Sequence, residues 1–257
     1  KRLRKESSIP VWHDDQQGTA AVTLAGLINA VKVVGKKMSE VKIVFMGAGA
    51  SNVRIADVIF QAGADSKKCI MYDSKGSLHK NRSDIKDNPA WQEKWNICLK
   101  TNERQFDGPI WDALKGADAL IALSKPGPDT VKKEWISKMA KDSIVFVCAN
   151  PVPEIWPWEA KEAGARIVAT GRSDFPNQVN NSLGFPGIFR GALDVRASTI
   201  TDEMCIEAAR ELARTAEDKG LDEEHIIPNM DEWEVFPREA AAVGMKAIEQ
   251  GIAGKII

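Results

Sequence analysis

Short hydrophobic runs alternate with amphipathic segments along most of the chain. The first run covers 41–47 and ends in glycine, a helical pattern follows over 50–62, and a second run covers 67–73. Unbroken apolar runs of this length predict buried strands. The order strand, glycine-rich turn, helix and strand predicts a βαβ unit.

The alternation continues toward the C-terminus. Further strands are predicted over 117–124, 143–151 and 166–171, and further helices near 130–140, 157–163, 201–219 and 237–252. Continuous apolar strands separated by helices are typical of a parallel sheet covered on both faces. We therefore predict an α/β fold, a doubly wound (Rossmann-type), mostly parallel sheet with C-terminal helices.

Three segments lie outside this alternation. Residues 20–34 have a helical pattern, whereas 74–110 are polar and only weakly periodic. We expect 74–110 to form an excursion with one short helix and not a second domain. Residues 171–194 combine Gly, Pro and Asn with apolar side chains, and we expect a packed binding loop there in place of a regular element.

Charge and apolar content narrow the function. The 257 residues hold 35 Lys and Arg against 36 Asp and Glu, a formal charge of −1, so no global field favours nucleic acid or an anionic membrane. The apolar runs fall far short of the about 20 residues that a membrane span needs. The balanced charge favours small-molecule chemistry or protein contact. The four cysteines are too widely spaced for a CxxC motif, which favours a reduced, cytoplasmic chain.

The first glycine-rich turn has the pattern of a dinucleotide site. Gly47 permits a tight turn, and Gly49 lets the backbone approach a pyrophosphate at the start of the helix. Asn52 occupies the third glycine position of GxGxxG, so close packing of helix on strand is less assured. The alternative is a turn that only connects strand to helix.

The second strand ends in Asp73, where a carboxylate accepts hydrogen bonds from a ribose diol. A carboxylate repels a 2′-phosphate, so Asp73 favours NAD over NADP. Lys75 and Lys80 are near enough to offset that repulsion, which keeps NADP open. A solvated loop is the simpler interpretation of both lysines.

A polar cluster, HDDQQ, stands at 13–17 between apolar neighbours. Adjacent carboxylates on an extended chain point in different directions, so one can bind a hard divalent cation while the other holds a basic partner. Helix capping by Asp15 or Thr19 is the alternative.

Strand ends supply further candidates, because ligands of open parallel sheets bind outside the carboxyl ends of the strands. Asn150 follows one predicted strand and Ser124 ends another. The loop that follows offers neutral donors at Asn177, Asn180 and Asn181. His79 and His225 have polar surroundings and are expected at the surface.

Taken in order, several of these segments resemble the malic enzymes of the compact prokaryotic type. They are IPVWHDDQQGTA, the strand-GAGAS-helix unit, YDSKGSLHKNRSDI, CANPVPEI and GRSDFPNQVNNSLGFPGIFRGALDVRA. The resemblance implies oxidative decarboxylation of malate to pyruvate and CO₂ with NAD⁺ or NADP⁺, dependent on Mg²⁺ or Mn²⁺. It also implies a homodimer or higher homo-oligomer.

The resemblance assigns roles to single residues. Asp15 resembles the family's third metal ligand. Asp14 resembles the neighbouring catalytic-site residue that orients the family's catalytic lysine. Asn150 and Asn181 resemble residues that contact substrate and nicotinamide. Ser124 is a candidate for cofactor contact only by its place at a strand end, and a turn-forming serine is the alternative. Four residues match the phosphate turn and two the ribose region: Gly47, Gly49, Ala50, Ser51, Asp73 and Lys75.

The family's general acid Tyr, general base Lys and Glu-Asp metal pair lie upstream of the HDD motif, and none is in this chain. Tyr72 ends the second Rossmann strand and cannot be that acid. We therefore expect 1–20 to be a remnant of a largely absent N-terminal substrate and metal domain, and 21–257 to be the NAD(P)-binding domain. The chain begins at Lys1 without Met, so a longer gene product is expected.

Three functions remain open at this point. The first is an active malic enzyme to which this chain contributes the cofactor-binding half. The second is a dinucleotide-binding module that is catalytically silent alone, and the third is a malolactic enzyme that turns malate into lactate.

Overall fold

The computed structural model describes residues 2–255, which form a six-stranded mixed sheet with helices on both faces. The strands are β1 (Ile43–Met46), β2 (Ile70–Asp73), β3 (Gly76–Ser77), β4 (Ala119–Ala122), β5 (Ser143–Val147) and β6 (Ala165–Thr170). Their order is β3-β2-β1-β4-β5-β6, and every neighbouring pair is parallel except β2 with β3. The predicted doubly wound α/β fold is confirmed.

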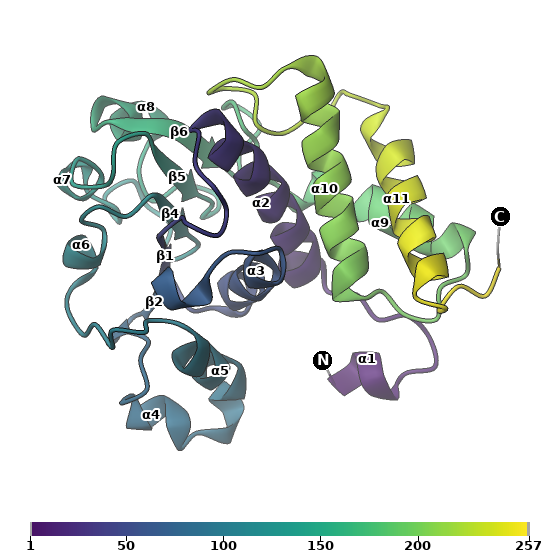
Figure 1. Cartoon of the computed structure of the whole chain (residues 1–257), viewed down its shortest axis with the longest axis horizontal. Coiled ribbons are helices and arrows are strands. Elements are labelled where there is room, and N and C mark those ends of the chain that lie inside the picture. The colour runs from purple at the N-terminus through teal and green to yellow at the C-terminus, as the bar shows by residue number, and fades with distance from the viewer. Residues whose placement is uncertain (1, 256–257) are drawn as a thin grey trace.

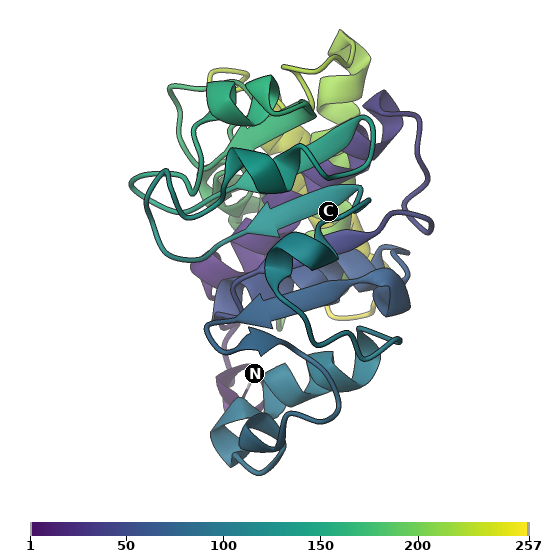
Figure 2. The ribbon, with the colours of Figure 1, turned by 90° about the vertical axis from the view of Figure 1, so that its left-hand side faces the viewer.

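Alternate residues of each strand face opposite layers, as the pleat requires. Phe45 and Phe146 belong to the larger core, whereas Val44 and Val145 belong to the smaller one. Helices α2 (Asp14–Val33) and α3 (Ala50–Gln61) cover the first face. Helices α6 (Ile110–Ala113), α7 (Lys133–Ile136) and α8 (Pro157–Glu162) lie on the other side of the sheet (Figures 1 and 2).

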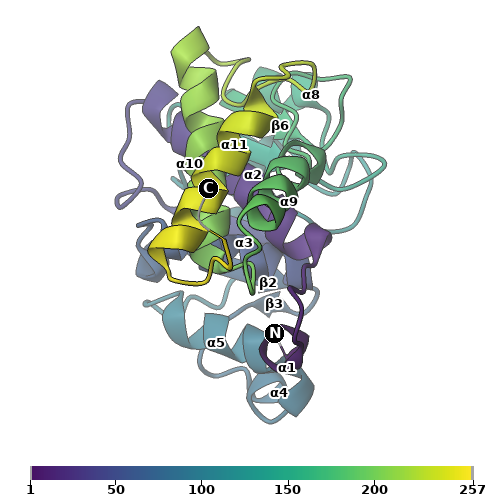
Figure 3. The same cartoon turned by 90° about the vertical axis from the view of Figure 1, so that its right-hand side faces the viewer.

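A further layer packs outside α2. It consists of α9 (Phe185–Asp194), α10 (Asp202–Lys219) and α11 (Val235–Glu249), seen side by side in Figure 3. Buried Asn29 of α2 donates to the carbonyls of Ala213 and Ile226, at 2.8 and 3.0 Å. This side chain therefore holds α2 in place against α10 and the loop that follows it.

The excursion over 74–110 contains more structure than the sequence predicts. It holds β3, α4 (Ser83–Lys86) and α5 (Gln92–Lys100), so the expectation of one short helix was wrong. In α5 only Ile97 and Cys98 are buried, and such a narrow apolar stripe leaves little periodicity to detect. The segment still forms no second domain, because these side chains join the larger core.

The Gly/Pro-rich segment is also more regular than expected. Its second half forms α9, so the prediction that it lacks a regular element was wrong. Pro186 sits in the first turn, where proline is tolerated. Gly191 faces α11 so closely that a Cβ would lie 2.3 Å from the Ala240 carbonyl oxygen. A glycine that resembles a turn signal is therefore required for helix packing.

Most other bounds agree with the predictions to within a few residues, but α7 is much shorter than the predicted 130–140, and α2 begins at Asp14 and not at 20. Asp14 and Asp15 lie in the first turn of α2, so the expectation of an extended chain there was wrong. A short α1 (Arg2–Glu6) precedes α2, and the predicted domain boundary at residue 20 falls inside α2. Among the described residues, no helix combines the length and apolar character needed to cross a membrane.

Candidate functional site

The carboxyl edge of the sheet collects most of the predicted residues. Gly47, Asp73, Ser124 and Asn150 stand at or just beyond the ends of β1, β2, β4 and β5, which run parallel. Because parallel strands end at one edge, these four positions share one side of the molecule. In open α/β sheets that edge is where ligands bind.

The turn after β1 has the geometry of a phosphate cradle. Gly47 has φ +101°, and a Cβ there would lie 2.3 Å from the Leu123 carbonyl oxygen. Gly49 has open space where its Cβ would be, and it precedes the first residue of α3. The N–H groups of the first helical turn have no partners within the helix, so they are free to meet an anion.

Asn52 stabilises this turn. It is fully buried, and its amide donates to the carbonyls of Gly47 (2.8 Å) and Met46 (3.2 Å). The expectation that a residue other than glycine loosens the packing of helix on strand was therefore wrong. The side chain replaces the missing glycine contact with hydrogen bonds to the end of β1.

The Asp73 carboxylate forms ion pairs with basic side chains of the 74–110 excursion. Arg82 donates to both of its carboxylate oxygens, at 3.2 and 3.0 Å, and the Lys94 ammonium lies 3.5 Å away. Burial acts to raise the pKa of Asp73, but hydrogen bonds from Arg82 and the Lys75 N–H lower it. Lys75 is exposed, and its ammonium pairs with Asp84 at 3.1 Å. Sequence reasoning missed Arg82 and Lys94.

Sequence reasoning also missed Glu154. It has no exposed surface, and its carboxylate accepts hydrogen bonds from the loops after β4 and β5. The donors are the N–H and hydroxyl of Ser124, at 2.8 and 3.2 Å, and the N–H of Ala149, at 3.1 Å. Burial raises the pKa of Glu154, and these donors oppose the rise.

The HDD motif begins α2 and meets the Asn-rich loop. Asn181 donates to Asp14 Oδ2 at 2.5 Å, and the Trp12 indole donates to Oδ1 at 3.4 Å. Gly18 makes room for this pair, since a Cβ there would lie 2.1 Å from Asp14 Oδ1. Burial and the neighbouring Asp15 raise the pKa of Asp14. Two predicted site residues 167 positions apart are thus in direct contact.

Asp15 is exposed beside Asp14. Within 2–255 no group of three or more His, Cys, Asp or Glu side chains could hold a metal ion. The described residues therefore offer one carboxylate at this place and not a complete cation site.

The other asparagines have different tasks. Buried Asn177 donates to the carbonyls of Val168 and Glu223, and Asn180 donates to Gly171. The expectation that Asn177 offers donors to a ligand was wrong, because the chain itself takes both of its amide hydrogens, whereas Asn180 gives one amide hydrogen to the chain. Asn150 is exposed, and its amide stands over Gly171 at the end of β6.

Two cavities border these groups. One, of about 320 Å³, lies between the phosphate turn and the excursion, with Ala48, Ala50 and Lys94 in its wall. The other, of about 360 Å³, lies beside His13 and Trp12. Gln16 and Arg54 line both, so the cavities adjoin between the turn and the HDD motif.

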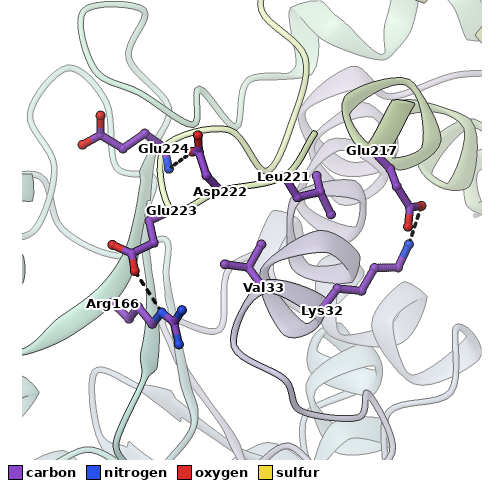
Figure 4. Close-up of a pocket in the computed structure, with 8 residues that line it drawn as sticks. All are labelled: Lys32, Val33, Arg166, Glu217, Leu221, Asp222, Glu223 and Glu224. Carbon is purple, nitrogen blue, oxygen red and sulfur yellow. Dashed lines mark hydrogen bonds and ion pairs between the residues drawn. The ribbon is translucent and has the colours of Figure 1, made fainter. Parts of the chain in front are cut away.

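A larger groove of about 670 Å³ opens at the opposite, amino edge of the sheet (Figure 4). Its charges pair with one another: Lys32 with Glu217 at 2.7 Å and Arg166 with Glu223 at 3.0 Å. No predicted site residue lines it.

Three side chains that the sequence analysis did not place in the site are His79, His225 and Tyr72. His79 is buried, so the expectation that it is a surface residue was wrong, and His225 is half-buried. The Tyr72 hydroxyl donates to the Gly108 carbonyl, and burial raises its pKa.

Comparison with known proteins agrees with this geometry. The family model of the malic enzyme NAD-binding domain matches residues 16–248. The bifunctional malic/malolactic enzyme of Bacillus subtilis is 47% identical over 253 residues, 98% of this chain and 60% of that protein. The NAD-dependent malic enzyme of Geobacillus stearothermophilus is 45% identical, over 99% of this chain and 51% of that protein. The NADP-dependent enzyme of Halomonas elongata is 40% identical, with 98% and 61% covered.

Among solved structures, the malic enzyme of Entamoeba histolytica superposes with a TM-score of 0.97 at 59% identity, covering 99% of this chain and 52% of that one. The chain spans 51% to 61% of the length of these curated relatives. The chain belongs to the malic enzyme family and corresponds to its NAD-binding domain.

Proposed function

We propose that the protein oxidatively decarboxylates malate with NAD⁺ or NADP⁺ and that this chain provides the cofactor-binding half. Hydride leaves C2 of malate for the nicotinamide, and the C2 hydroxyl loses its proton to a base. The C3–C4 bond of the resulting keto acid then breaks to release CO₂, and proton return to C3 gives pyruvate.

The contact of Asp14 with Asn181 carries this proposal. It joins the start of α2 to the loop beyond β6, next to the edge that holds the phosphate turn. One amide hydrogen of Asn181 is used by Asp14, so the amide oxygen and the second hydrogen are left for substrate. Asn150 lies exposed at the same edge and serves as the second polar contact to substrate or nicotinamide.

Gly49, Ala50 and Ser51 would hold the pyrophosphate of a dinucleotide at the carboxyl edge of the sheet. Asp73 already accepts three hydrogen bonds, two from Arg82 and one from the Lys75 N–H, so a ribose hydroxyl would compete with these donors. The cations around it are as compatible with a 2′-phosphate as the carboxylate is with a diol. We therefore propose NAD or NADP and no longer favour NAD.

A divalent cation belongs to this proposal only in part. Asp15 supplies one oxygen ligand, and hard cations such as Mg²⁺ take several. The described residues 2–255 do not provide a complete set, so the other ligands of the cation would be substrate, water or side chains outside these residues.

The direct test uses the intact protein with malate and either cofactor. We expect stoichiometric pyruvate, CO₂ and NAD(P)H, and Asn181→Ala should remove most of this turnover. Tight dinucleotide binding without any product from malate would contradict the proposal and would favour a silent binding module.

A second candidate function is the malolactic reaction, which the name of the Bacillus subtilis relative brings forward. Here hydride returns from the reduced cofactor to the keto group, so lactate forms without net NAD(P)H. Product analysis separates the two reactions, because lactate without NAD(P)H is compatible only with the redox-neutral one.

A further inference from the structure

We propose that Glu154 is a positioning residue that holds the loops after β4 and β5 in the arrangement that receives the nicotinamide half of the dinucleotide. This proposal rests on the proposed function. The side chain contacts Ser124 and Ala149 and has no exposed surface, so it acts through these loops and does not touch a ligand itself.

Each carboxylate oxygen of Glu154 serves one loop. Oε1 accepts both donors of Ser124, at 2.8 and 3.2 Å, and Oε2 accepts the N–H of Ala149 at 3.1 Å. A carboxylate suits this place because it has two oxygens that only accept. Hydrogen bonds to an ionised acceptor are also about twice as strong as neutral ones.

The backbone near Glu154 adds to the same clamp. Its carbonyl accepts from Val131 at 2.9 Å, and the Val152 carbonyl accepts from Gly127 at 3.4 Å. The segment after β5 is thus tied to the segment after β4 by four donors, namely the N–H and hydroxyl of Ser124 and the N–H groups of Gly127 and Val131, across strands that end side by side. Losing the side chain would leave the buried N–H of Ala149 and the partly buried N–H of Ser124 without an acceptor.

The clamp lies under one half of the ligand. In a doubly wound sheet each half of the strands takes one mononucleotide. The phosphate turn and Asp73 follow β1 and β2, so the adenosine half belongs there, and the β4 and β5 loops meet the nicotinamide half. We therefore expect Glu154 to matter for the whole dinucleotide and little for ADP.

The amino edge offers a matched control in Asp118. Its carboxylate accepts from the Lys42 N–H and the Lys36 ammonium, both at 2.8 Å, and so clamps the beginnings of β1 and β4. Asp118→Asn weakens a clamp of the same kind at the edge remote from the ligand.

The test measures dissociation constants of the intact protein for NAD(P)⁺ and for ADP by calorimetry, with melting temperatures. In Glu154→Gln one loop loses its acceptor and meets an amide hydrogen, so Kd for the dinucleotide should rise about tenfold. Kd for ADP should stay within about twofold, and Asp118→Asn should change neither constant. Ser124→Ala removes only the hydroxyl contact and should raise the dinucleotide Kd by a smaller factor. This variant tests the proposal if Glu154→Gln does not fold.

The outcomes separate the two proposals. A wild-type protein without dinucleotide affinity would refute the proposed function itself. Wild-type affinity retained in Glu154→Gln, or equal losses for the dinucleotide and ADP, would refute only the positioning role, as would unchanged binding in Ser124→Ala where Glu154→Gln is unfolded.

Discussion

At the amino edge of the sheet, the Asp118 carboxylate receives donors from Lys42 and Lys36, and at the carboxyl edge Glu154 receives donors from Ser124 and Ala149. Both carboxylates join neighbouring strands, but their surroundings differ. The groove at the amino edge is lined by paired charges, whereas at the carboxyl edge Gly49 faces open space and Asn150 is exposed. Saturated polar groups stabilise a fold, and unsaturated ones at a strand end are free to bind a ligand.

The largest expected contrast between the two edges is between substitutions of Gly47 and Gly164. Gly47 at the carboxyl edge and Gly164 before β6 have φ of +101° and +102°, but only Gly47 is closely approached, by the Leu123 carbonyl. Gly164→Ala should cost about 1–2 kcal/mol of the free energy of unfolding through strain alone. Gly47→Ala should cost about 3 kcal/mol or more and abolish dinucleotide binding. Urea unfolding and calorimetry check both, and equal effects of the two substitutions would remove the asymmetry.

Two asparagines separate turnover from stability. Asn181→Ala should lower kcat about 100-fold, because Asp14 loses the partner that fixes its position and the substrate loses an amide. Asn29→Ala, toward the other end of α2, breaks two buried hydrogen bonds and should cost about 1–3 kcal/mol with kcat unchanged. Steady-state kinetics beside unfolding curves decide, and a large loss of kcat in Asn29→Ala would contradict the separation.

Glu239 of α11 shows a buried carboxylate without donors. It has no exposed surface, both oxygens lack a hydrogen-bond partner among the described residues, and burial raises its pKa well above 4.5. Because the folded state holds this proton more tightly, stability falls as pH rises from about 4.5 toward the raised value. Glu239→Gln should remove that fall, as unfolding measured at several pH values will show. Parallel stability curves for the two proteins would refute this reading.

The smallest effect is expected in the amino-edge groove. Glu223→Gln breaks the ion pair with Arg166, in which the two side chains are 52% and 36% exposed. The free energy of unfolding should therefore fall by less than about 1 kcal/mol. Cofactor affinity should stay at the wild-type value. A clear rise of Kd here would give the groove a part in binding that its paired charges do not indicate.

Local rules explain what the sequence predicts well. The strands follow from apolar runs, and Gly47 and Asp73 follow from the order of strand, turn and helix. The partners of these residues do not follow, since Arg82 and Lys94 come from a segment with little periodicity. Its buried residues are too few to mark its helices.

Contacts between distant segments account for the remaining differences. Asn177 bonds to Glu223, 46 positions away, so its structural task is invisible in its own neighbourhood. Glu154 gives no such signal either, because a glutamate in a loop is usually exposed, and its burial follows from partners at Ser124, 30 positions away, and Ala149. Asp14 and Asn181 were predicted separately, the first to orient a lysine and the second to contact substrate, and the structure brings them together.

Hydrogen exchange of the intact protein, measured by mass spectrometry with and without NAD(P)⁺, tests the central claim most directly. The carboxyl edge is predicted to become protected in 47–53, 123–125 and 148–151, with the amino-edge segments 117–119 and 221–224 unchanged. Protection confined to the amino edge, or equal at both edges, would contradict the account.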